Sequence, residues 1–486
     1  MVFSHNLSRN MPVIPRRRPR DPASFHTAFK GTGSRGLRRG MTLIALIFTF
    51  SSSHAQIWDA ERFLQLASLE SLRQFQAHES KQHYTLLDKN DYQHIVHDAR
   101  GKVLEILTLL KSNQAMSADD QIALIISQLI DKPYLTINGM GEGDWQPGSY
   151  TYKSGAAHIK QYPVYRFDGF DCQTFVQVVM SLLHAHSSDE FDERLIKIAY
   201  GAAGNPNGNI VRYYNRNHFV DADFNRINNQ HGFLEDITKD KRFEKISKSQ
   251  TITITRNEWF KKQIANLEDN VKVLNDQDGL AMAARFQQYY QNLPFPNFKL
   301  ETIKINYLPK EELIRLTWNG KLIANKVLLD QIPTPAILEN VRDVNSWQAF
   351  GRKMKDIIGS ELSISHMGIL YRHTFKKGEI IHYQTKCARD SKEVGCHVTP
   401  QTCQQNACQE LMIAHATNHF PKHYLWYKKT NGDYTCSPYP PSKGTAYTSC
   451  NRVVAQPFFD YLTDKQFGDY WTMMPSFLGV HVEKIT

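Results

Sequence analysis

The sequence predicts an α+β fold with an antiparallel sheet, and three observations support this class. The first part of the chain carries apolar residues at helical spacing among charged ones. After residue 303 the pattern changes to short segments typical of strands. The helices and strands follow one another in two blocks, whereas a parallel α/β sheet needs them to alternate. At roughly 150 residues per domain, the 486 residues predict two to three domains, with one elaborated domain as the alternative.

Residues 1–55 are typical of an export signal with a long basic leader. Basic residues up to Arg39 precede an apolar run over residues 41–50, and Ser53-His54-Ala55 then offers small residues where signal peptidase cleaves. A basic disordered tail is the alternative, and Met11 is a second candidate for the translation start. The apolar run is too short for a membrane-spanning helix, which needs about 20 residues. We therefore expect an exported protein, periplasmic or extracellular, without a stable membrane span.

The net charge of +10 would favour a nucleic-acid partner if it were spread over the whole chain. Residues 1–55, however, hold nine Lys or Arg and one Asp, which is +8 of this total. The rest of the chain carries only the remaining +2. We therefore expect no nucleic-acid partner.

Residues 56–130 are expected to form a helical N-terminal region. Apolar residues recur there three and four positions apart, among charged residues. Asp119 and Asp120 suit the first turn of its last helix, which ends before the break at Lys132-Pro133.

Residues 131–486 form the second predicted domain and carry the candidate site. Residues 134–170 are rich in Gly, Tyr, Pro and Asn and should form loops, and a helix with an apolar stripe follows over residues 172–184. Polar, helix-like residues predict an insertion over about residues 239–300. Strands are predicted over residues 364–371, 379–383, 411–416 and 479–485.

Six of the seven cysteines lie in one polar part of the second domain that is rich in Gly and Pro. In an exported protein they are expected to form three disulfides in an insertion over about residues 384–410 and 430–452, and their connectivity stays open. A structural zinc site is the alternative, although the spacings are irregular and no Cys-x-x-Cys pair occurs. The disulfide candidates are Cys387, Cys396, Cys403, Cys408, Cys436 and Cys450.

The seventh cysteine, Cys172, is the first candidate catalytic residue because it opens an amphipathic helix just after a glycine-containing turn. At a helix start, the backbone N–H groups and the positive end of the dipole favour a thiolate. The same N–H groups can hold the oxyanion that forms when a carbonyl is attacked. The alternative is a buried, inert cysteine. The odd number of cysteines and the polar neighbours Asp171 and Gln173 argue for a nucleophile.

A thiolate nucleophile needs a base from elsewhere in the chain. His366 lies in a predicted strand with Gly368 on the same face, which we expect to let the helix approach closely. His415 is the one polar side chain of another short strand, and a hydrogen bond to His366 would fix the tautomer of that ring. Each histidine has an ordinary structural role as its alternative. A strand adjacent to that of His366 could supply such a hydrogen-bond partner.

Several separated motifs, taken in order, resemble the NlpC-type, papain-like peptidoglycan hydrolases, and more narrowly their N-acetylmuramoyl-L-alanine amidase-like branch. The resemblance implies a papain-like core in which a helix bearing the nucleophile packs on an antiparallel sheet. It also implies a triad of Cys172, His366 and His415. The motifs run from about residue 130 to the C-terminus and are Lys132-Pro133-Tyr134, Phe170-Asp171-Cys172-Gln173-Thr174-Phe175-Val176, Asn215-Arg216-Asn217-His218-Phe219, Asp236-Ile237-Thr238, Asn306-Tyr307-Leu308-Pro309-Lys310, Ser365-His366-Met367-Gly368-Ile369 and His415-Ala416-Thr417.

The resemblance further implies four residues that bind substrate. Tyr134 would line the acyl site, and Asp171 would contact the substrate directly. Arg216, with His218 beside it in the Arg-x-His segment of the branch, would hold a peptide carboxylate.

The chain departs from the superfamily at Gln173 and Thr174, where Ser and Gly are common, and from the branch at Gln177, where Glu is common. The cysteine-rich insertion begins between His366 and His415. We therefore expect it to border the cleft and to restrict access.

The expected reaction is hydrolysis of an amide bond in peptidoglycan or a muropeptide, preferably the bond between the N-acetylmuramoyl lactyl group and L-alanine. Two alternatives stay open: a stem-peptide endopeptidase of the same fold, and a catalytically silent cell-wall-binding or surface-recognition protein. A zinc amidase is disfavoured because the sequence holds no His-Glu-x-x-His pattern. We therefore expect neither a cofactor nor a metal, and the sequence does not predict the oligomeric state.

Overall fold

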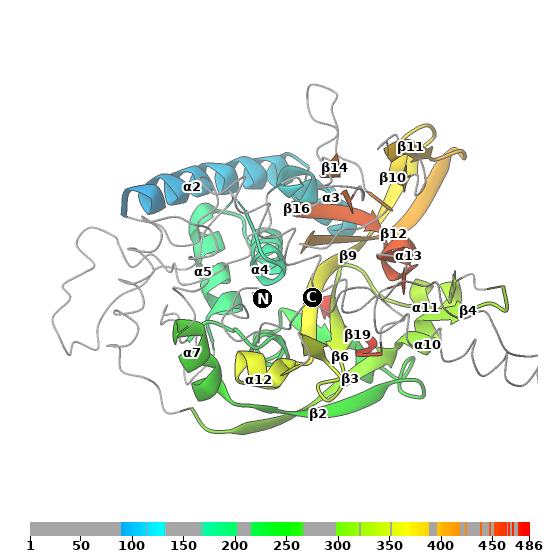
Figure 1. The fold of residues 1–486 in the computed structure, drawn as a ribbon. Helices are drawn as coiled ribbons and strands as arrows, with labels where there is room; N and C mark the ends of the chain where they lie inside the picture. Colours follow the sequence, from blue (N-terminus) through cyan, green and yellow to red (C-terminus); the bar gives the residue numbers. More distant parts are fainter. Residues whose placement is uncertain are drawn as a thin grey trace, which may run out of the picture.

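An eight-stranded antiparallel sheet with helices on both faces forms the centre of the computed structural model (Figure 1). The structure describes residues 89–486 except for residues 114, 131, 133–166, 168, 202–214, 266–297, 320–321, 350–351, 388–395, 418–422, 425–437, 440–446, 449–451, 464, 467–468 and 471–474. The strand order is β16-β12-β9-β6-β19-β3-β2, and β1 also pairs with β19. The strands are β1 (Leu234–Asp236), β2 (Lys248–Ile254), β3 (Glu301–Pro309), β6 (Ala336–Arg342), β9 (Ile364–Lys376), β12 (Ala407–Thr417), β16 (Arg452–Pro457) and β19 (Phe477–Ile485).

One face of the sheet is covered by the helices α2 (Lys89–Ser112), α3 (Ala118–Leu129), α4 (Cys172–Leu183) and α5 (Ser188–Ala199) (Figure 1). Helix α4 lies directly on β9 and β12. Its side chains Phe175 and Val179 share a core with Met367 and Ile369 of β9 and Met412 of β12. The apolar stripe that predicted this helix is therefore the surface that packs on the sheet.

Shorter helices pack on the opposite face of the sheet. They are α10 (Lys310–Leu313), α11 (Lys326–Asp330) and α13 (Phe458–Thr463) (Figure 1). Leu370 and Ile413 point into this second core, where they meet Phe458 and Leu462 of α13. Because side chains alternate along a strand, β9 and β12 contribute to both cores at once.

The remaining elements connect or border the main sheet. A separate three-stranded sheet, in the order β11-β10-β13, extends from the end of β9. The other elements are η2 (Val220–Phe224), α6 (Asn225–Gln230), η3 (Ile237–Lys239), α7 (Arg256–Ala265), β4 (Ile314–Leu316), β5 (Leu322–Ala324), β7 (Gln348–Ala349), β8 (Arg352–Lys353), α12 (Met354–Ile358), β10 (Ile380–Cys387), β11 (Cys396–Thr402), β13 (His423–Tyr424), β14 (Pro438–Tyr439), β15 (Tyr447–Thr448), β17 (Lys465–Gln466) and β18 (Asp469–Tyr470).

The predicted α+β class and antiparallel sheet are confirmed. Each of the four predicted strands is present, and β9 and β12 are several residues longer than predicted. Helix α3 begins after its N-cap Ser117 and carries Asp119 and Asp120 in its first turn, as predicted. Residues 56–88 of the expected helical N-terminal region lie outside the described residues, and α2 and α3 share the core of α4 and the sheet.

The prediction of a polar helical insertion over residues 239–300 is wrong for residues 248–254. These residues form β2, which pairs along its whole length with β3 in the main sheet, although α7 follows as a helix. The buried side chains of Ile252 and Ile254 alternate with Thr251 and Thr253, a period typical of a strand. The polar composition of the wider stretch hides this short alternation. Residues 266–297 lie outside the described residues.

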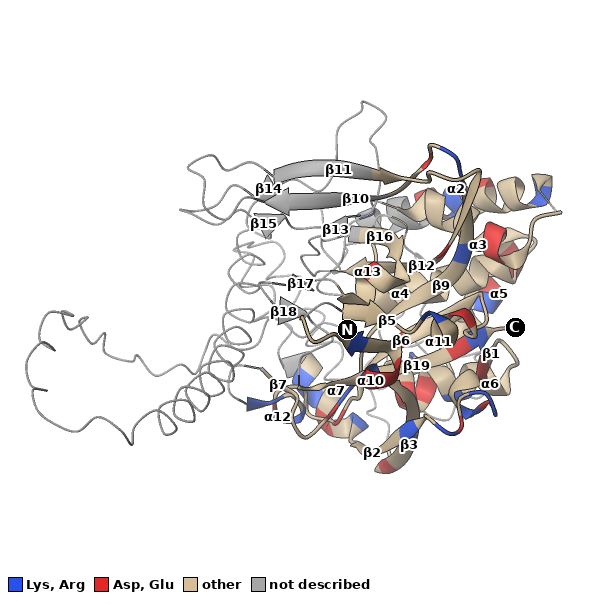
Figure 2. Cartoon of the chain, turned by 90° about the vertical axis from the view of Figure 1, so that its right-hand side faces the viewer, with Lys and Arg blue, Asp and Glu red and all other residues tan. Residues whose placement is uncertain are grey.

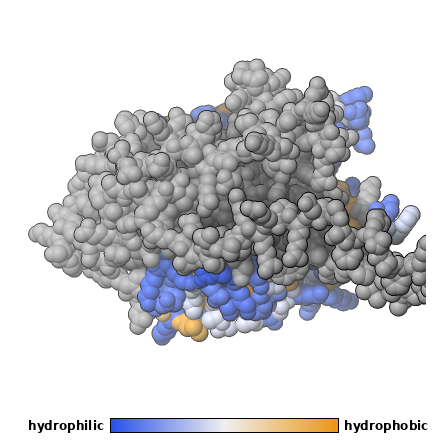
Figure 3. Space-filling view, in the orientation of Figure 1, coloured by the Kyte–Doolittle hydropathy of each residue, from blue (hydrophilic) through white to orange (hydrophobic). Residues whose placement is uncertain are grey.

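The described surface is mostly polar where it can be seen. In Figure 3 the described part along the lower edge, over β2 and its neighbours, is largely hydrophilic with a small apolar spot. Within the described residues, none of the helices combines the length and the hydrophobicity needed to cross a bilayer.

Candidate active site

Helix α4 begins at Cys172 because Asp171 caps it. The Asp171 carboxylate accepts a hydrogen bond from the Thr174 backbone N–H at 2.6 Å, and the Thr174 hydroxyl accepts one from the Asp171 N–H at 3.1 Å. Such a reciprocal capping box satisfies two backbone donors, and its cap residue contributes about 1 kcal/mol. Cys172 therefore occupies the first helical position. Asp171 has this structural role, and its predicted contact with substrate stays a prediction.

The strands β9 and β12 stop pairing with each other close to the candidate residues. Their last paired residues are Ile369 and Ala414, whereas β12 continues with β16 as far as Thr417. The backbone N–H of Met367, just beyond that last pair, donates a hydrogen bond to Cys172 Sγ. The start of α4 therefore meets the sheet where these two strands separate.

The structure brings His366 and His415 together at this opening. His366 Nε2 lies 2.7 Å from His415 Nδ1, and the two ring planes are inclined by 78°. Both side chains are buried, with 8% and 3% of their surface exposed. One ring nitrogen of His366 is thus used by His415, in a geometry that can fix the tautomer of His366.

Gly368 leaves room for the contact between His366 and His415, whereas the sequence predicted that it leaves room for the helix. A Cβ at this position would lie 2.8 Å from the Ala414 carbonyl oxygen and 2.9 Å from the His415 Cβ. The expectation that Gly368 admits the helix was therefore wrong. The missing side chain instead gives room to His415 on the neighbouring strand.

Three further polar side chains surround the histidine pair, and none was predicted from the sequence. Gln456 Nε2 lies 3.1 Å from His415 Nε2, and the Asn340 amide donates to the Tyr461 hydroxyl at 2.6 Å. Asn340 pairs with His366 across β6 and β9, and the Tyr461 ring lies edge-on to His415 at 5.1 Å. Gln456 did carry a signal, because it is a lone polar side chain in an apolar strand, as His415 is.

The environment of the Cys172 thiol opposes ionisation more than its place on the helix suggested. Burial raises the pKa of the thiol, and the neighbouring Asp171 carboxylate raises it as well. The Met367 N–H acts in the opposite direction because it stabilises the thiolate. A thiolate at this site therefore needs a partner that takes up the proton, and an imidazole can do so.

Arg216 and His218 are both buried, in a segment tied to the start of α4. The Gln173 side chain donates a hydrogen bond to the Asn217 carbonyl, and the Asn217 amide donates to the Ile198 carbonyl at 2.9 Å. The His218 ring packs against Trp259 with 4.8 Å between the ring centres. The departure at Gln173 thus has a structural reason, and the substrate roles of Arg216 and His218 stay predictions.

The other predicted site residues are covered only in part. Tyr134 lies outside the described residues, as do Cys436 and Cys450. Cys403 and Cys408 form a disulfide, and Cys172 keeps its thiol. Cys387 and Cys396 face each other in the register of β10 and β11, and their side chains lie outside the described residues.

A second polar cluster lies on the other side of β6 and contains side chains of the kind that bind metals. Asp236, His481 and Glu483 place potential ligand atoms within 4.8 Å of one another. His481 Nδ1, however, lies 2.8 Å from the Asn306 carbonyl oxygen, and its Nε2 lies 2.9 Å from Glu483 Oε1. Despite burial, Glu483 and the nearby carboxylates raise the pKa of His481 to about 10. The ring is therefore an imidazolium at neutral pH, and because both of its nitrogens carry protons, neither has a lone pair for a metal ion.

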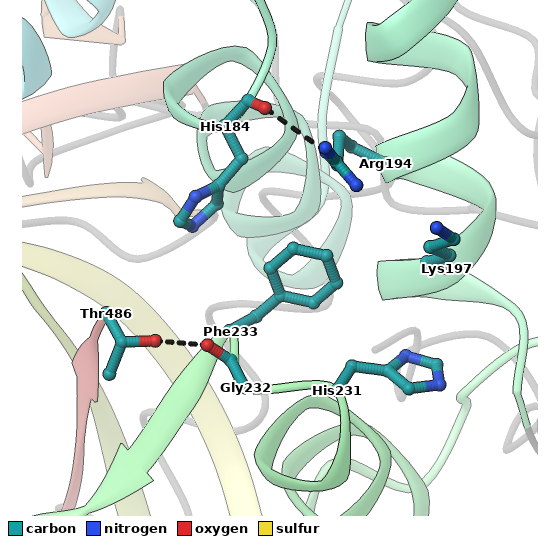
Figure 4. Close-up of a pocket in the computed structure, with 7 residues that line it drawn as sticks. All are labelled: His184, Arg194, Lys197, His231, Gly232, Phe233 and Thr486. Carbon is teal, nitrogen blue, oxygen red and sulfur yellow. Dashed lines mark hydrogen bonds between the residues drawn. The ribbon is translucent and has the colours of Figure 1, made fainter.

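A cavity of about 510 Å³ lies at the opposite end of α4 from Cys172 (Figure 4). Its basic side chains are His184, Arg194, Lys197 and His231. Helix α4 has 12 residues and is therefore about 18 Å long, so this cavity is remote from the candidate site.

Charges of both signs are interspersed over the described elements in Figure 2. Acidic and basic residues lie next to each other on α5, where Arg100 of α2 also contacts Asp189 and Asp192. The described surface in this view thus does not resemble the one-signed patch typical of nucleic-acid binding.

Comparison with known proteins shows to which family the chain belongs. A family model described as AmiA-like, N-acetylmuramoyl-L-alanine amidase-like, matches residues 149–395 and so includes Cys172 and His366. A crystal structure of a protein from Legionella pneumophila str. Philadelphia 1 is similar, with 20% sequence identity, a TM-score of 0.47, and 81% of this chain and 96% of that chain covered. The comparison with curated proteins gave no match. Because the family model matches just over half of the 486 residues, the protein belongs to the N-acetylmuramoyl-L-alanine amidase-like family.

Proposed function

We propose that the protein is a cysteine-dependent amidase that cleaves the bond between the N-acetylmuramoyl lactyl group and L-alanine in peptidoglycan or its fragments. The observation that supports this most directly is the arrangement of Cys172 and the histidine pair. Cys172 lies at the start of a capped helix and contacts the backbone of Met367, the residue after His366. His366 in turn contacts His415 at 2.7 Å.

The reaction follows from the chemistry of these groups. His366 accepts the thiol proton, and Cys172 Sγ attacks the lactyl carbonyl carbon to form a C–S bond and an oxyanion. The backbone N–H at the start of α4 stabilises that oxyanion. His366 then gives its proton to the amide nitrogen, the C–N bond breaks, and the peptide leaves with a free L-alanine amine.

Water completes the reaction by hydrolysing the thioester. His366 takes a proton from the water, the hydroxide adds to the acyl carbon, and the C–S bond breaks. The lactyl carboxylate is released and Cys172 recovers its proton. His415 holds His366 in position throughout, and the mechanism uses no metal.

The order of the cysteine and the two histidines, and the packing of α4 on β9 and β12, support a place in the NlpC-type, papain-like superfamily. We also propose that the protein is exported, on the basis of residues 1–55, and that Cys387, Cys396, Cys436 and Cys450 form two further disulfides. Tyr134, Asp171, Arg216 and His218 remain the proposed substrate-binding residues.

Digestion of purified muropeptides, followed by mass spectrometry of the products, tests the proposed bond. An amidase releases the intact stem peptide from the sugar, whereas an endopeptidase leaves part of the stem attached. The Cys172→Ala variant should stay folded and lose turnover, and the wild-type enzyme should be inactivated by iodoacetamide and resist chelators. A wild-type protein that binds peptidoglycan without releasing any product would instead support a recognition protein.

A further inference from the structure

Gln456 ends a buried chain of polar side chains that begins at the proposed base. His366 Nε2 contacts His415 Nδ1 at 2.7 Å, and His415 Nε2 contacts Gln456 Nε2 at 3.1 Å. Gln456 is 2% exposed. It pairs with Ile413 across β12 and β16, so it lies two positions along the same face from His415. The carboxamide is therefore held against the outer nitrogen of His415 by the register of the sheet.

The Gln456 contact matters because the positions of the protons on the two rings decide whether His366 can act as a base. A contact between two ring nitrogens holds one proton, so one ring donates and the other accepts. His366 acts as a base only when its Nδ1 is unprotonated, which requires its proton on Nε2 and His415 as the acceptor. His415 then carries its own proton on Nε2. That proton needs an acceptor because the site is buried.

Gln456 can supply either partner for His415. In the structure its amide nitrogen faces His415, and its Oε1 is buried without a hydrogen-bond partner among the described residues. This orientation makes His415 Nε2 an acceptor, which places protons on His415 Nδ1 and on His366 Nδ1. A half turn of the amide exchanges its nitrogen and oxygen, so that Oε1 accepts a hydrogen bond from His415 Nε2. The proton of each ring then lies on Nε2 instead of Nδ1.

We propose that Gln456 is a positioning residue that sets the tautomer of His366 through His415 by the orientation of its amide. This inference rests on the proposed function, since it concerns the base of that reaction. With Oε1 towards His415, His366 is ready to accept the thiol proton, and the resulting imidazolium is stabilised along the same hydrogen bonds. With the nitrogen towards His415, the proton on His366 Nδ1 prevents that transfer. Among the described residues, the titratable and charged groups near the pair include Cys172 on α4 with Asp171 beside it, and Tyr461 on α13 with Arg342 near it.

The test measures how fast iodoacetamide alkylates Cys172 across the pH range, because this rate reports the thiolate without any substrate. In the full-length chain, Gln456→Leu should react about tenfold more slowly than wild type at pH 7, by analogy with metal-bound histidines, where loss of the partner that orients the ring costs about 10–100-fold. Gln456→Glu offers acceptor oxygens alone and should keep the rate. Its negative charge should also move the alkaline limb of the turnover profile to higher pH.

The control is Gln177→Leu, the same replacement at a buried glutamine of α4 whose amide nitrogen has no partner among the described residues. Equal alkylation rates in wild type and Gln456→Leu would overturn the proposal, as would an equal loss in Gln177→Leu. If Gln456→Leu does not fold, Gln456→Glu decides alone, and an unshifted turnover profile in that variant overturns the proposal. The experiment distinguishes failure of this proposal from failure of the proposed function. If the protein does not turn over muropeptides, the alkylation rates of Cys172 still show whether Gln456 acts on His366 through His415.

Discussion

His415 lies opposite Gly368, one position beyond the last paired residues of β9 and β12. A methyl group at Gly368 would overlap the His415 Cβ and the Ala414 carbonyl oxygen. The separation of the two histidine rings therefore depends on the absence of a side chain at this glycine.

We expect Gly368→Ala to lose about 1–3 kcal/mol of unfolding free energy, the usual cost of overpacking a dense interior. Muropeptide turnover should fall as well, because His415 is pushed away from His366. Gly101→Ala is the matched control: its Cβ would meet no atom within 4 Å, and alanine in a helix should stabilise by about 0.5–1 kcal/mol. Urea unfolding and turnover measure both variants, and a fully active, stable Gly368→Ala would contradict the role of this glycine.

Two substitutions at Asp171 should distinguish its role as the cap of α4 from the effect of its charge on Cys172. Asp171→Ala removes the cap of α4 and should cost about 1 kcal/mol, whereas Asp171→Asn keeps an equally good cap. Because the Asp171 carboxylate raises the pKa of the Cys172 thiol, Asp171→Asn should lower that pKa and speed alkylation at neutral pH. Ser187→Ala, which removes the cap of α5, should cost similar stability without changing the alkylation rate. Slower alkylation in Asp171→Asn would contradict this assignment.

The buried carboxyl of Glu339 should make the free energy of unfolding fall as the pH rises. Burial raises the pKa of this carboxyl from 4.5 to about 8, so between these values the folded protein holds a proton that the unfolded chain has released. Stability from this group is complete below pH 4.5 and declines through pH 8, with a slope of at most about 1.4 kcal/mol per pH unit. Glu339→Gln removes this decline, so its stability relative to wild type should rise from pH 5 to pH 8 in urea unfolding.

The buried ion pair between Arg256 and Asp223 should be costly to break on one side. Arg256 Nη2 lies 2.6 Å from Asp223 Oδ1, and the two side chains are 7% and 1% exposed. Arg256→Met leaves Asp223 buried with the more distant Arg226 as its cationic partner among the described residues, also removes the ion pair with Glu301, and should cost about 3–5 kcal/mol. The double variant Arg256→Met, Asp223→Leu should recover most of that loss. A double-mutant cycle in urea checks this, and purely additive losses would contradict it.

The elements with a clear period were predictable from the sequence, and so was the meeting of two distant histidines. The predicted strand of His415 carried one polar side chain among apolar ones, and a strand adjacent to that of His366 was expected to supply a hydrogen-bond partner for its ring. The start of α4 was predictable because a glycine-containing turn precedes an apolar stripe.

The partners of these residues were not predictable, because pairing register decides them. Gln456 reaches His415 since β16 pairs with β12, and Asn340 lies opposite His366 since β6 pairs with β9. Local sequence does not encode either neighbour. The pKa of the Cys172 thiol is raised, whereas its place at a helix start predicted that a thiolate would be favoured. The helix start is visible in the sequence, but the depth of burial depends on the assembled core.

The place of β19 within the sheet determines when the sheet can assemble during synthesis of the chain. Residues 477–485 form an interior strand, flanked by β6 on one side and by β3 and β1 on the other. The two halves of the sheet therefore cannot join before β19, which follows both of its neighbours in the chain, has left the ribosome. A nascent chain that stalls or is truncated upstream of it would expose two unpaired strand edges, which invite aggregation.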